Sequence, residues 1–444
     1  MTIFNLDFSI ISIVALCIAF IAAMIALGPG MSPQRRTGKE PQYIEPADPS
    51  YIDETDSEDQ SPIDSDNPES PSSQEQQVAT EVKSVIIEKT NSKQISNKKA
   101  PLVSVIAYTP DYSESLDEFI DSISKQDYPR FELILVLDAG VEVREMLVEK
   151  YLNVPGLYLT FIPPGSQNLS RRKLAITIGM KAAKGEVAVL TSSICHIPSE
   201  KWLSGMMSQF IENQYLEVAL GFCRTHNVGA RGLKGLWRRW FSANTAMQWI
   251  GYALEGKAYR GDGYNLALRR STFFNHKGFA QTVNIHCGEE DLFVNEITNA
   301  ANTRMILDSD TILTVDWGEA ASKMWIDRRE SHDFTSRWLP RGPFRRSAML
   351  SWCQWLMLLG CVGGAIASLP NLLPAALAIL LFVLVYITEV YVWSRGYRAI
   401  APFKKWWSTP FFILWKPIGN RLFRWRHRSE RLKNYTWQNK RRRG

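Results

Sequence analysis

The chain has 444 residues, of which 45% are hydrophobic and 22% are charged, and it carries a formal net charge of +6. This length is enough for two or three average domains, but the apolar residues are unevenly distributed, which favours one large globular unit with membrane segments. The six cysteines include no Cys-x-x-Cys pair, which argues against a zinc site and against a disulfide framework.

Residues 1–29 predict an N-terminal transmembrane helix. Residues 8–27 carry no charge, and at about 1.5 Å per residue such a helix crosses the hydrocarbon core of a bilayer. A cleaved signal peptide is the alternative. Against it, no Lys or Arg precedes the apolar run, and the run is long for a signal peptide.

Residues 30–100 predict an acidic, disordered linker. Residues 41–82 contain no Lys or Arg but many Asp and Glu, together with Ser, Pro and Gln. A segment of this composition cannot bury enough apolar surface to fold.

Residues 101–345 predict one α/β domain. Short β-branched runs of the buried kind, which predict strands, alternate with segments of helical periodicity. Repeated β-α-β units give a mostly parallel, Rossmann-like sheet with helices on both faces. Strands are expected at 102–106, 131–137, 157–161 and 187–190, and helices at 115–125, from about 142, and at 170–183.

Two polar positions follow strands of this predicted sheet. Asp138 comes after the second strand, and Ser192 with Ser193 comes after the fourth. Ligands of such sheets bind at the carboxyl ends of the strands, so both positions are expected to face one crevice. The Asp138 carboxylate suits a base N–H or a ribose hydroxyl, and a helix N-cap or turn residue is the alternative.

Residues 346–394 predict a transmembrane helical hairpin, with spans at 348–369 and 372–393 around a short Pro-Asn break. A pair of buried core helices is the alternative. Lys and Arg cluster after the first span, before the second and after the third, but not in the hairpin turn. The positive-inside rule then places the N-terminus outside, and the central domain and C-terminus in the cytoplasm at the plasma (inner) membrane.

Residues 395–444 form a basic tail that is rich in aromatic residues and ends in Lys-Arg-Arg-Arg-Gly. Beside a membrane hairpin, we expect the rings to lie at the interface and the cations to meet anionic headgroups of the lipid bilayer. Nucleic-acid binding is the alternative for such a tail, and we do not expect it.

Six segments of the central domain follow one another in a characteristic order. They are Val103–Ile106, Gln126–Pro129, Phe131–Ile134, Lys181–Glu186, Pro198–Leu203 and Gly288–Phe293. In order and spacing they resemble the signatures of family 2 glycosyltransferases, the group that contains cellulose and hyaluronan synthases. The resemblance covers about residues 101–338. It implies a GT-A fold, a nucleotide-diphosphate sugar donor, inversion at the anomeric carbon and, often, membrane helices beside a cytoplasmic catalytic domain.

An acidic triplet lies in the last of these segments. An inverting transfer needs a base that takes the proton of the acceptor hydroxyl. Three successive carboxylates repel one another, which tends to raise the pKa of at least one. By resemblance, Glu290 is the expected base, with Glu289 and Asp291 as orienting neighbours. A solvated acidic turn that caps the helix near Leu292 is the alternative.

The family's Asp-x-Asp motif is degenerate in this chain. Ser192 and Ile194 stand where the family has carboxylates that bind Mg²⁺ or Mn²⁺. Hard divalent cations need charged oxygen ligands, so no metal-binding residues are predicted and the cofactor stays open. Arg171 and Lys173, with Arg172 between them, begin the preceding helix and are candidates to offset phosphate charge directly. An ordinary basic helix start is the alternative.

Residues 334–338 occupy the place of the family's Gln-x-x-Arg-Trp element, which in processive members holds the acceptor end and the diphosphate. Arg337 and Trp338 match it, whereas Phe334 replaces the Gln, so the element is incomplete and processivity is not predicted. A membrane-interface anchor is the alternative for Trp338. The nucleotide-sugar site is thus predicted at Asp138, Arg171, Lys173, Ser192, Arg337 and Trp338.

The sequence therefore predicts a membrane-bound inverting glycosyltransferase that moves a sugar from a nucleotide-diphosphate donor to a hydroxyl of a glycan, lipid or polysaccharide. The alternative is a catalytically inactive relative that serves as a membrane scaffold or regulatory subunit for other glycan-synthesis proteins. The substitutions at Ser192 and Ile194 motivate that alternative.

Overall fold

A computed structural model describes residues 2–27, 87–88, 100–110, 115–163, 170–367, 372–400 and 406–427. Most of the predicted linker and the end of the predicted tail lie outside these residues. One feature differs from the predicted linker, because Ile87 and Glu88 form a short strand that pairs with Arg130 and Phe131.

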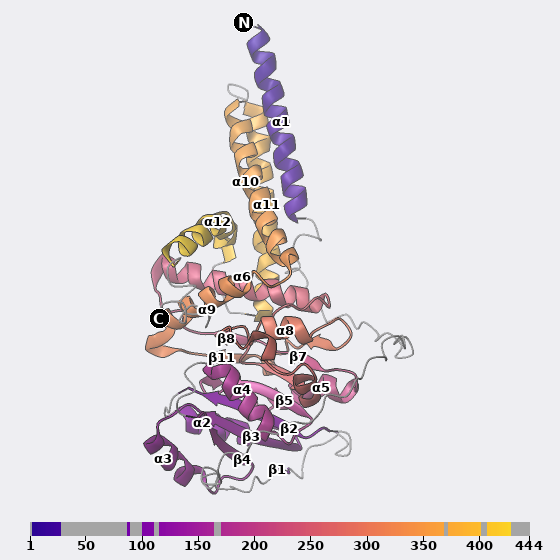
Figure 1. Ribbon diagram of the computed structural model, residues 1–444. Coiled ribbons are helices and arrows are strands. Elements are labelled where there is room, and N and C mark those ends of the chain that lie inside the picture. Colours follow the sequence, from indigo (N-terminus) through magenta and orange to yellow (C-terminus); the bar gives the residue numbers. More distant parts are fainter. Residues whose placement is uncertain are drawn as a thin grey trace, which may run out of the picture.

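A central sheet lies in the middle of the globular part (Figure 1). Its order is β1-β3-β2-β5-β9-β7-β10, and β4 also pairs with β3. Strands β2, β3, β4 and β5 run parallel, and β9 is antiparallel to both of its neighbours. The strands are β1 (Ile87–Glu88), β2 (Val103–Thr109), β3 (Arg130–Leu137), β4 (Leu157–Phe161), β5 (Val187–Ser192), β7 (Val218–Leu220), β9 (Leu266–Arg269) and β10 (Thr303–Met305).

A second, three-stranded sheet is formed by β6 (Cys195–His196), β11 (Leu313–Val315) and β8 (Cys223–Thr225), in that order. Asn265 joins this region to the large sheet. Its buried side-chain amide donates to the carbonyls of Phe222, at 3.1 Å, and Thr311, at 2.8 Å. Because an unpaired buried amide is costly, these bonds fix the two sheets relative to each other.

The helices cover both faces of the sheet. In α2, the buried residues Leu116, Phe119, Ile120 and Ile123 recur at helical spacing, which is why this segment packs as a helix. The helices are α1 (Thr2–Leu27), α2 (Ser115–Ser124), α3 (Val141–Tyr151), α4 (Arg171–Ala182), α5 (Trp202–Glu212), α6 (Gly232–Leu254), α7 (Arg270–Asn275), α8 (Leu292–Ile297), α9 (Ala321–Thr335), α10 (Arg341–Ala367), α11 (Leu372–Ile400) and α12 (Thr409–Arg426).

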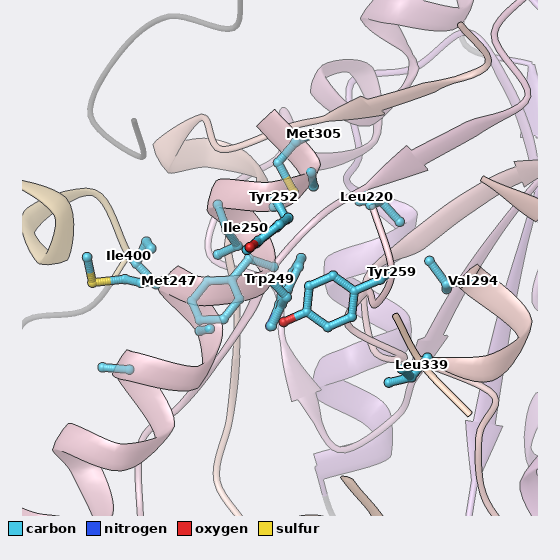
Figure 2. Packing of buried hydrophobic residues seen from close by; sticks show 14 of the residues in the cluster. Leu220, Met247, Trp249, Ile250, Tyr252, Tyr259, Val294, Met305, Leu339 and Ile400 are labelled. Atoms are coloured by element: carbon cyan, nitrogen blue, oxygen red, sulfur yellow. The ribbon is translucent and has the colours of Figure 1, made fainter. Parts of the chain in front are cut away.

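Two apolar clusters form the core, one on each face of the sheet. Alternating residues of β3 enter different clusters, since Ile134 and Val136 belong to one while Leu133 and Leu135 belong to the other. The first cluster extends over α4, α6 and α8 to the end of α11 at Ile400, and Figure 2 shows part of it. The prediction of an α/β domain with a mostly parallel sheet is confirmed.

Three long helices, α1, α10 and α11, rise together from one end of the globular part, and α6 lies across their base (Figure 1). Within the described residues, two helices are long and apolar enough to cross a membrane, at Arg341–Ala367 and Ala375–Gly396, and a shorter apolar stretch lies at Ile13–Ile25. The predicted spans are therefore helical, and their crossing of a bilayer remains a prediction.

Helices α1 and α10 approach closely at Gly360. A Cβ atom added there would lie 2.7 Å from the carbonyl oxygen of Ala15 and 2.9 Å from the Cβ of Ala19. Small residues allow such close backbone contact between helices in a membrane. A Gly360→Leu variant is expected to separate α1 from α10, seen as loss of a disulfide between cysteines introduced at facing positions. Gly363→Leu is the control, because a Cβ at Gly363 meets nothing within 4 Å.

The beginning of the predicted tail differs from expectation. Helix α12 packs on the globular part, where the Phe412 ring lies 5.5 Å from Trp237 and 5.4 Å from Trp240. Only some of its rings are free to meet lipid, among them Trp415, which is 45% exposed, and Trp425, which is 77% exposed. The reason is that α12 is amphipathic, so one face is available to protein.

Candidate active site

The carboxyl ends of β2, β3 and β5 bring three predicted positions together. Asp138, directly after β3, accepts a hydrogen bond from Arg171 Nε at 2.8 Å and one from the Tyr108 hydroxyl at 3.3 Å. Ser192, at the end of β5, donates its hydroxyl to the Tyr108 carbonyl at 2.7 Å. The hydrogen bond from Arg171 is the main cause that lowers the pKa of Asp138, so this carboxylate is ionised at neutral pH.

Arg172 connects this edge to the acidic triplet. Arg171 points to Asp138, whereas Arg172 lies over the Tyr264 ring at 4.4 Å, with its Nε 3.9 Å from Glu289 Oε1. Two successive residues at the start of α4 thus contact Asp138 on one side and the triplet on the other. Asp138 and the acidic triplet therefore lie on either side of this pair of arginines.

Glu290 is the most heavily bonded carboxylate of the triplet. His332 Nε2 contacts its Oε1, Arg328 Nε lies 3.5 Å from the same oxygen, and the Gly263 backbone N–H donates to its Oε2 at 3.3 Å. Gly263 permits this approach because a Cβ there would lie 2.7 Å from Arg172 Nη2. Arg328 also pairs with Asp262 at 3.3 Å, so one guanidinium joins two buried carboxylates.

The pKa values of Glu289 and Glu290 are shifted in opposite directions. Burial would raise the pKa of Glu290, but Arg328, His332 and Arg172 outweigh burial and hold that pKa well below its ordinary value. For Glu289, burial raises the pKa and the charge of Glu290 adds to it, against the opposing effect of Arg172. The expected rise in pKa within the triplet therefore falls on Glu289 rather than on Glu290.

Asp291 has a structural role. Its side chain caps helix α8 by accepting the Leu292 N–H at 2.7 Å, and it also accepts the Thr335 hydroxyl. Arg260 lies 3.3 Å from Oδ2, the same oxygen that accepts the Thr335 hydroxyl, and Asp291 is 1% exposed. The alternative of a capping carboxylate thus describes Asp291, whereas Glu289 and Glu290 face a cavity.

That cavity, here named the acidic cavity, has a volume of about 200 Å³. Glu289 Oε2 and Arg172 Nη2 are both buried there without a hydrogen-bond partner among the described residues. Such atoms are costly to bury unpaired and are ready to bond a ligand. The cavity is lined by Arg172, Tyr264, Gly288, Glu289, Glu290, Trp317, Met324, Asp327, Arg328 and Ser331.

Lys173 does not line this cavity. Its ammonium donates to the carbonyls of Thr282, at 2.8 Å, and Ile285, at 2.9 Å, and to the Thr282 hydroxyl at 3.1 Å. All three protons are therefore used to hold the loop before the acidic triplet. The predicted phosphate role of Lys173 has no support in this geometry.

A Lys173→Met variant is expected to destabilise the fold by about 2–3 kcal/mol, because charged hydrogen bonds to the loop carbonyls are lost. Its affinity for a nucleotide sugar is expected to stay within about threefold of the parent at a temperature where both proteins are folded. Denaturant unfolding and calorimetric titration measure the two effects. A selective loss of nucleotide affinity would restore the phosphate role of Lys173.

Arg337 and Trp338 also lie outside the acidic cavity. They follow α9, where Arg337 Nε donates to the Phe334 carbonyl at 3.0 Å and its guanidinium lies over the Phe334 ring at 4.6 Å. Trp338 packs on the same ring and is 48% exposed. Phe334, in the place of the family's Gln, is thus the buried centre of this element.

The residues at the degenerate motif do not fit a divalent cation. The Ser192 hydroxyl is committed to the Tyr108 carbonyl, and Ile194 supplies no oxygen ligand. Within the described part of the chain, no group of three His, Cys, Asp or Glu side chains is arranged to hold a metal ion.

The contribution of α9 to the site was not predicted from the sequence. Trp325, Arg328, Arg329 and His332 recur at helical spacing, which places them on one face of the helix. Arg328 and His332 contact Glu290 from that face. Cations and a tryptophan on one helical face are the sequence signal that could have indicated this role, but the same pattern also fits an ordinary amphipathic helix.

Comparison with known proteins gives a local sequence match. No family model matches the chain. The poly(ribitol-phosphate) β-N-acetylglucosaminyltransferase TarS of Staphylococcus aureus, in two strains, is 26% identical over 132 residues, which is 29% of this chain. The match spans 22% of the length of that relative.

Solved structures with some likeness include a mannosyltransferase from Pyrobaculum calidifontis in complex with GDP-mannose and Mn²⁺. It has a TM-score of 0.46 and 17% identity over 93% of this chain and 99% of that one. Residues 1–349 of S. aureus TarS in complex with UDP-GlcNAc give a TM-score of 0.36 and 15% identity over 72% of this chain and 92% of that one. At these scores the likeness alone does not establish a common fold.

Proposed function

We propose that the chain is a membrane-bound, inverting glycosyltransferase of the GT-A type, which moves a sugar from a nucleotide-diphosphate donor to an acceptor hydroxyl. The observation that carries this proposal is the acidic cavity, where two glutamates with opposite pKa shifts meet two partly buried arginines, Arg172 and Arg328. The local match to a glycosyltransferase and the resemblance of residues 101–338 to family 2 agree with it.

The cavity contains the two kinds of group that the reaction requires. A base takes the proton of the acceptor hydroxyl while its oxygen attacks the anomeric carbon, and the bond from that carbon to the diphosphate breaks. The diphosphate leaves with the electron pair and needs positive charge. Arg172 and Arg328 line the cavity, and arginine binds phosphate oxygens in a bidentate manner without a metal ion.

We assign the base to Glu289 in place of Glu290. Glu290 is held by His332, Arg328 and Gly263, and its pKa lies well below the ordinary value, so it is a weak proton acceptor. Among the described residues, one oxygen of Glu289 has no hydrogen-bond partner, and burial raises the pKa of this residue, which suits a general base. Glu290 then serves to position Arg328.

In this proposed function, α1, α10 and α11 lie in a bilayer, and both the globular part and the C-terminus lie in the cytoplasm at the inner membrane. The lengths and compositions of α10 and α11 support this, and so does the distribution of Lys and Arg around the spans. The acceptor is a glycan, a lipid or a polysaccharide, and nucleic acid is not expected to bind.

The test uses the full chain in lipid nanodiscs with a panel of UDP- and GDP-sugars, with and without Mn²⁺ and EDTA. Release of nucleoside diphosphate is measured for the parent and for Glu289→Gln. We expect release that resists EDTA and is lost in the variant. No release across the panel would instead support the inactive scaffold, which the substitutions at Ser192 and Ile194 favour. In that case, carboxylates introduced at both Ser192 and Ile194 should leave the protein without transferase activity.

A further inference from the structure

A second cavity, here named the aromatic cavity, lies beside the acidic cavity between α6, α9 and β8. Its volume is about 290 Å³, at the lower end of the roughly 300–1,000 Å³ typical of small-ligand sites. The two cavities share Trp317 and Arg328. Asp262 and His332, which contact the Arg328–Glu290 pair, also line the aromatic cavity. A molecule in one cavity therefore lies against the same charged network as a molecule in the other.

The walls of the aromatic cavity have a distinct chemistry. One part of the wall consists of aromatic rings, which belong to Phe222, Phe241, Trp249, Trp317 and Trp325. Aromatic faces of this kind stack on the apolar side of a sugar ring or a similar group. The volume of the cavity matches a single sugar, a polyol or a headgroup.

The charged residues that line this cavity are mostly positive. Arg224, Arg239, Arg328 and Arg329 line it, and Asp262 is the acidic residue among its lining residues, where it is already paired with Arg328. Arg224 donates its Nε to the Ile400 carbonyl at 3.0 Å, and no ion pair joins Arg224 or Arg239 to a carboxylate in the described part of the chain. An excess of guanidinium groups beside rings suits an anion, and phosphate in particular.

We infer that the aromatic cavity binds the acceptor and that this acceptor carries a phosphate group next to its sugar or polyol. This inference rests on the proposed function. It assigns the acidic cavity to the donor and the aromatic cavity to the acceptor, with Trp317 and Arg328 between them. Arg224 and Arg239 select the phosphate, and the rings contact the sugar or polyol. The phosphate belongs either to a soluble ester or to a lipid headgroup.

The test uses the full chain in phosphatidylcholine nanodiscs and measures binding of glucose 6-phosphate and of glucose by calorimetry. We expect glucose 6-phosphate to bind at least tenfold more tightly than glucose. Arg239→Glu is expected to weaken glucose 6-phosphate at least tenfold, and Thr245→Trp, which fills the cavity from half-buried Thr245 of α6, should do the same.

Matched controls lie on the same helix. Lys234 and Leu233 are exposed residues of α6 that do not line the cavity, so Lys234→Glu and Leu233→Trp should leave the affinity for glucose 6-phosphate within twofold of the parent. Equal affinity for the two sugars, binding of neither, or an affinity unchanged by Arg239→Glu and Thr245→Trp would overturn the inference.

The source of the phosphate is read from nanodiscs that contain phosphatidylglycerol. Weaker glucose 6-phosphate binding there means that lipid headgroups compete for the cavity, and unchanged binding means a soluble ester. Binding of nucleotide sugars to the parent protein separates the two proposals. If donors bind and glucose 6-phosphate does not, this inference fails alone. If no donor binds while glucose 6-phosphate binds and responds to Arg239→Glu, the proposed function fails and the phosphate site stands.

Discussion

A Glu289→Gln variant is expected to lose about 10²–10⁴-fold in the rate of sugar transfer, the usual contribution of a general base. Gln keeps the size of Glu289 but cannot accept a proton. Initial rates at saturating donor, with thermal unfolding on the same samples, measure the effect. A rate within threefold of the parent would remove Glu289 from the mechanism.

The pH dependence gives a second readout of Glu289. The base must be deprotonated, so transfer should rise with pH through the pKa of Glu289, which burial holds above the ordinary 4.5. The effect on stability has the opposite sign. A raised pKa in the folded protein favours the neutral form, so Glu289 costs stability above that pKa and the cost vanishes below pH 4.5. Glu289→Gln should therefore unfold at a higher temperature than the parent at pH 7 and at an equal one at pH 4.

An Arg328→Ala variant is expected to lower the free energy of unfolding by about 3–5 kcal/mol and to abolish transfer. The guanidinium lies 3.3 Å from Asp262 and 3.5 Å from Glu290, and its removal leaves two buried carboxylates without their cation. Denaturant unfolding and transfer at a temperature where the variant is folded measure the two effects.

Arg337→Ala is the matched control for Arg328→Ala. Arg337 is an exposed residue two positions after the end of the same helix, outside the acidic cavity, so its loss should change the stability by less than about 1 kcal/mol and leave donor release intact. If Arg337→Ala abolishes donor release and Arg328→Ala does not, the family's Arg-Trp element acts as the resemblance implied and the present assignment is wrong.

The pKa shift of Glu290 also predicts acid sensitivity. Because its pKa is depressed in the folded protein, the ionised group contributes stability that is present above the ordinary pKa of 4.5 and is lost as the pH falls through the folded value. Arg328→Ala should reduce that loss, since the main attraction that lowers the pKa is gone.

The sequence predicts the sheet well because its parallel strands are continuous apolar runs. The run at 131–137 corresponds to β3, Arg130–Leu137, and the run at 157–161 to β4. It predicts β9 and the small second sheet poorly, since strands such as Leu266–Arg269 and Leu313–Val315 have three or four residues and gain their stability from tertiary pairing.

The site is only partly predictable, for a similar reason. The triplet, Asp138 and Arg171 follow from local pattern and resemblance, and the structure places them along one charged edge. Which residue pairs with which depends on distant elements. Glu290 meets His332 across 42 positions, and Lys173 meets Thr282 across 109. No local pattern indicates that the Lys173 ammonium is bound by loop carbonyls. None indicates either that Arg328 is the second cation of the acidic cavity, beside Arg172.

The long helices are joined to the globular part by partly buried polar contacts. Lys416 of α12 donates to Asn244 of α6 at 2.8 Å and to Ser347 of α10 at 2.7 Å, and Arg224 bonds the end of α11. With α10 and α11 in a bilayer, a change in their tilt must carry α6 along with it. Membrane thickness, which influences helix tilt, would then act on the shape of the cavity wall that α6 provides.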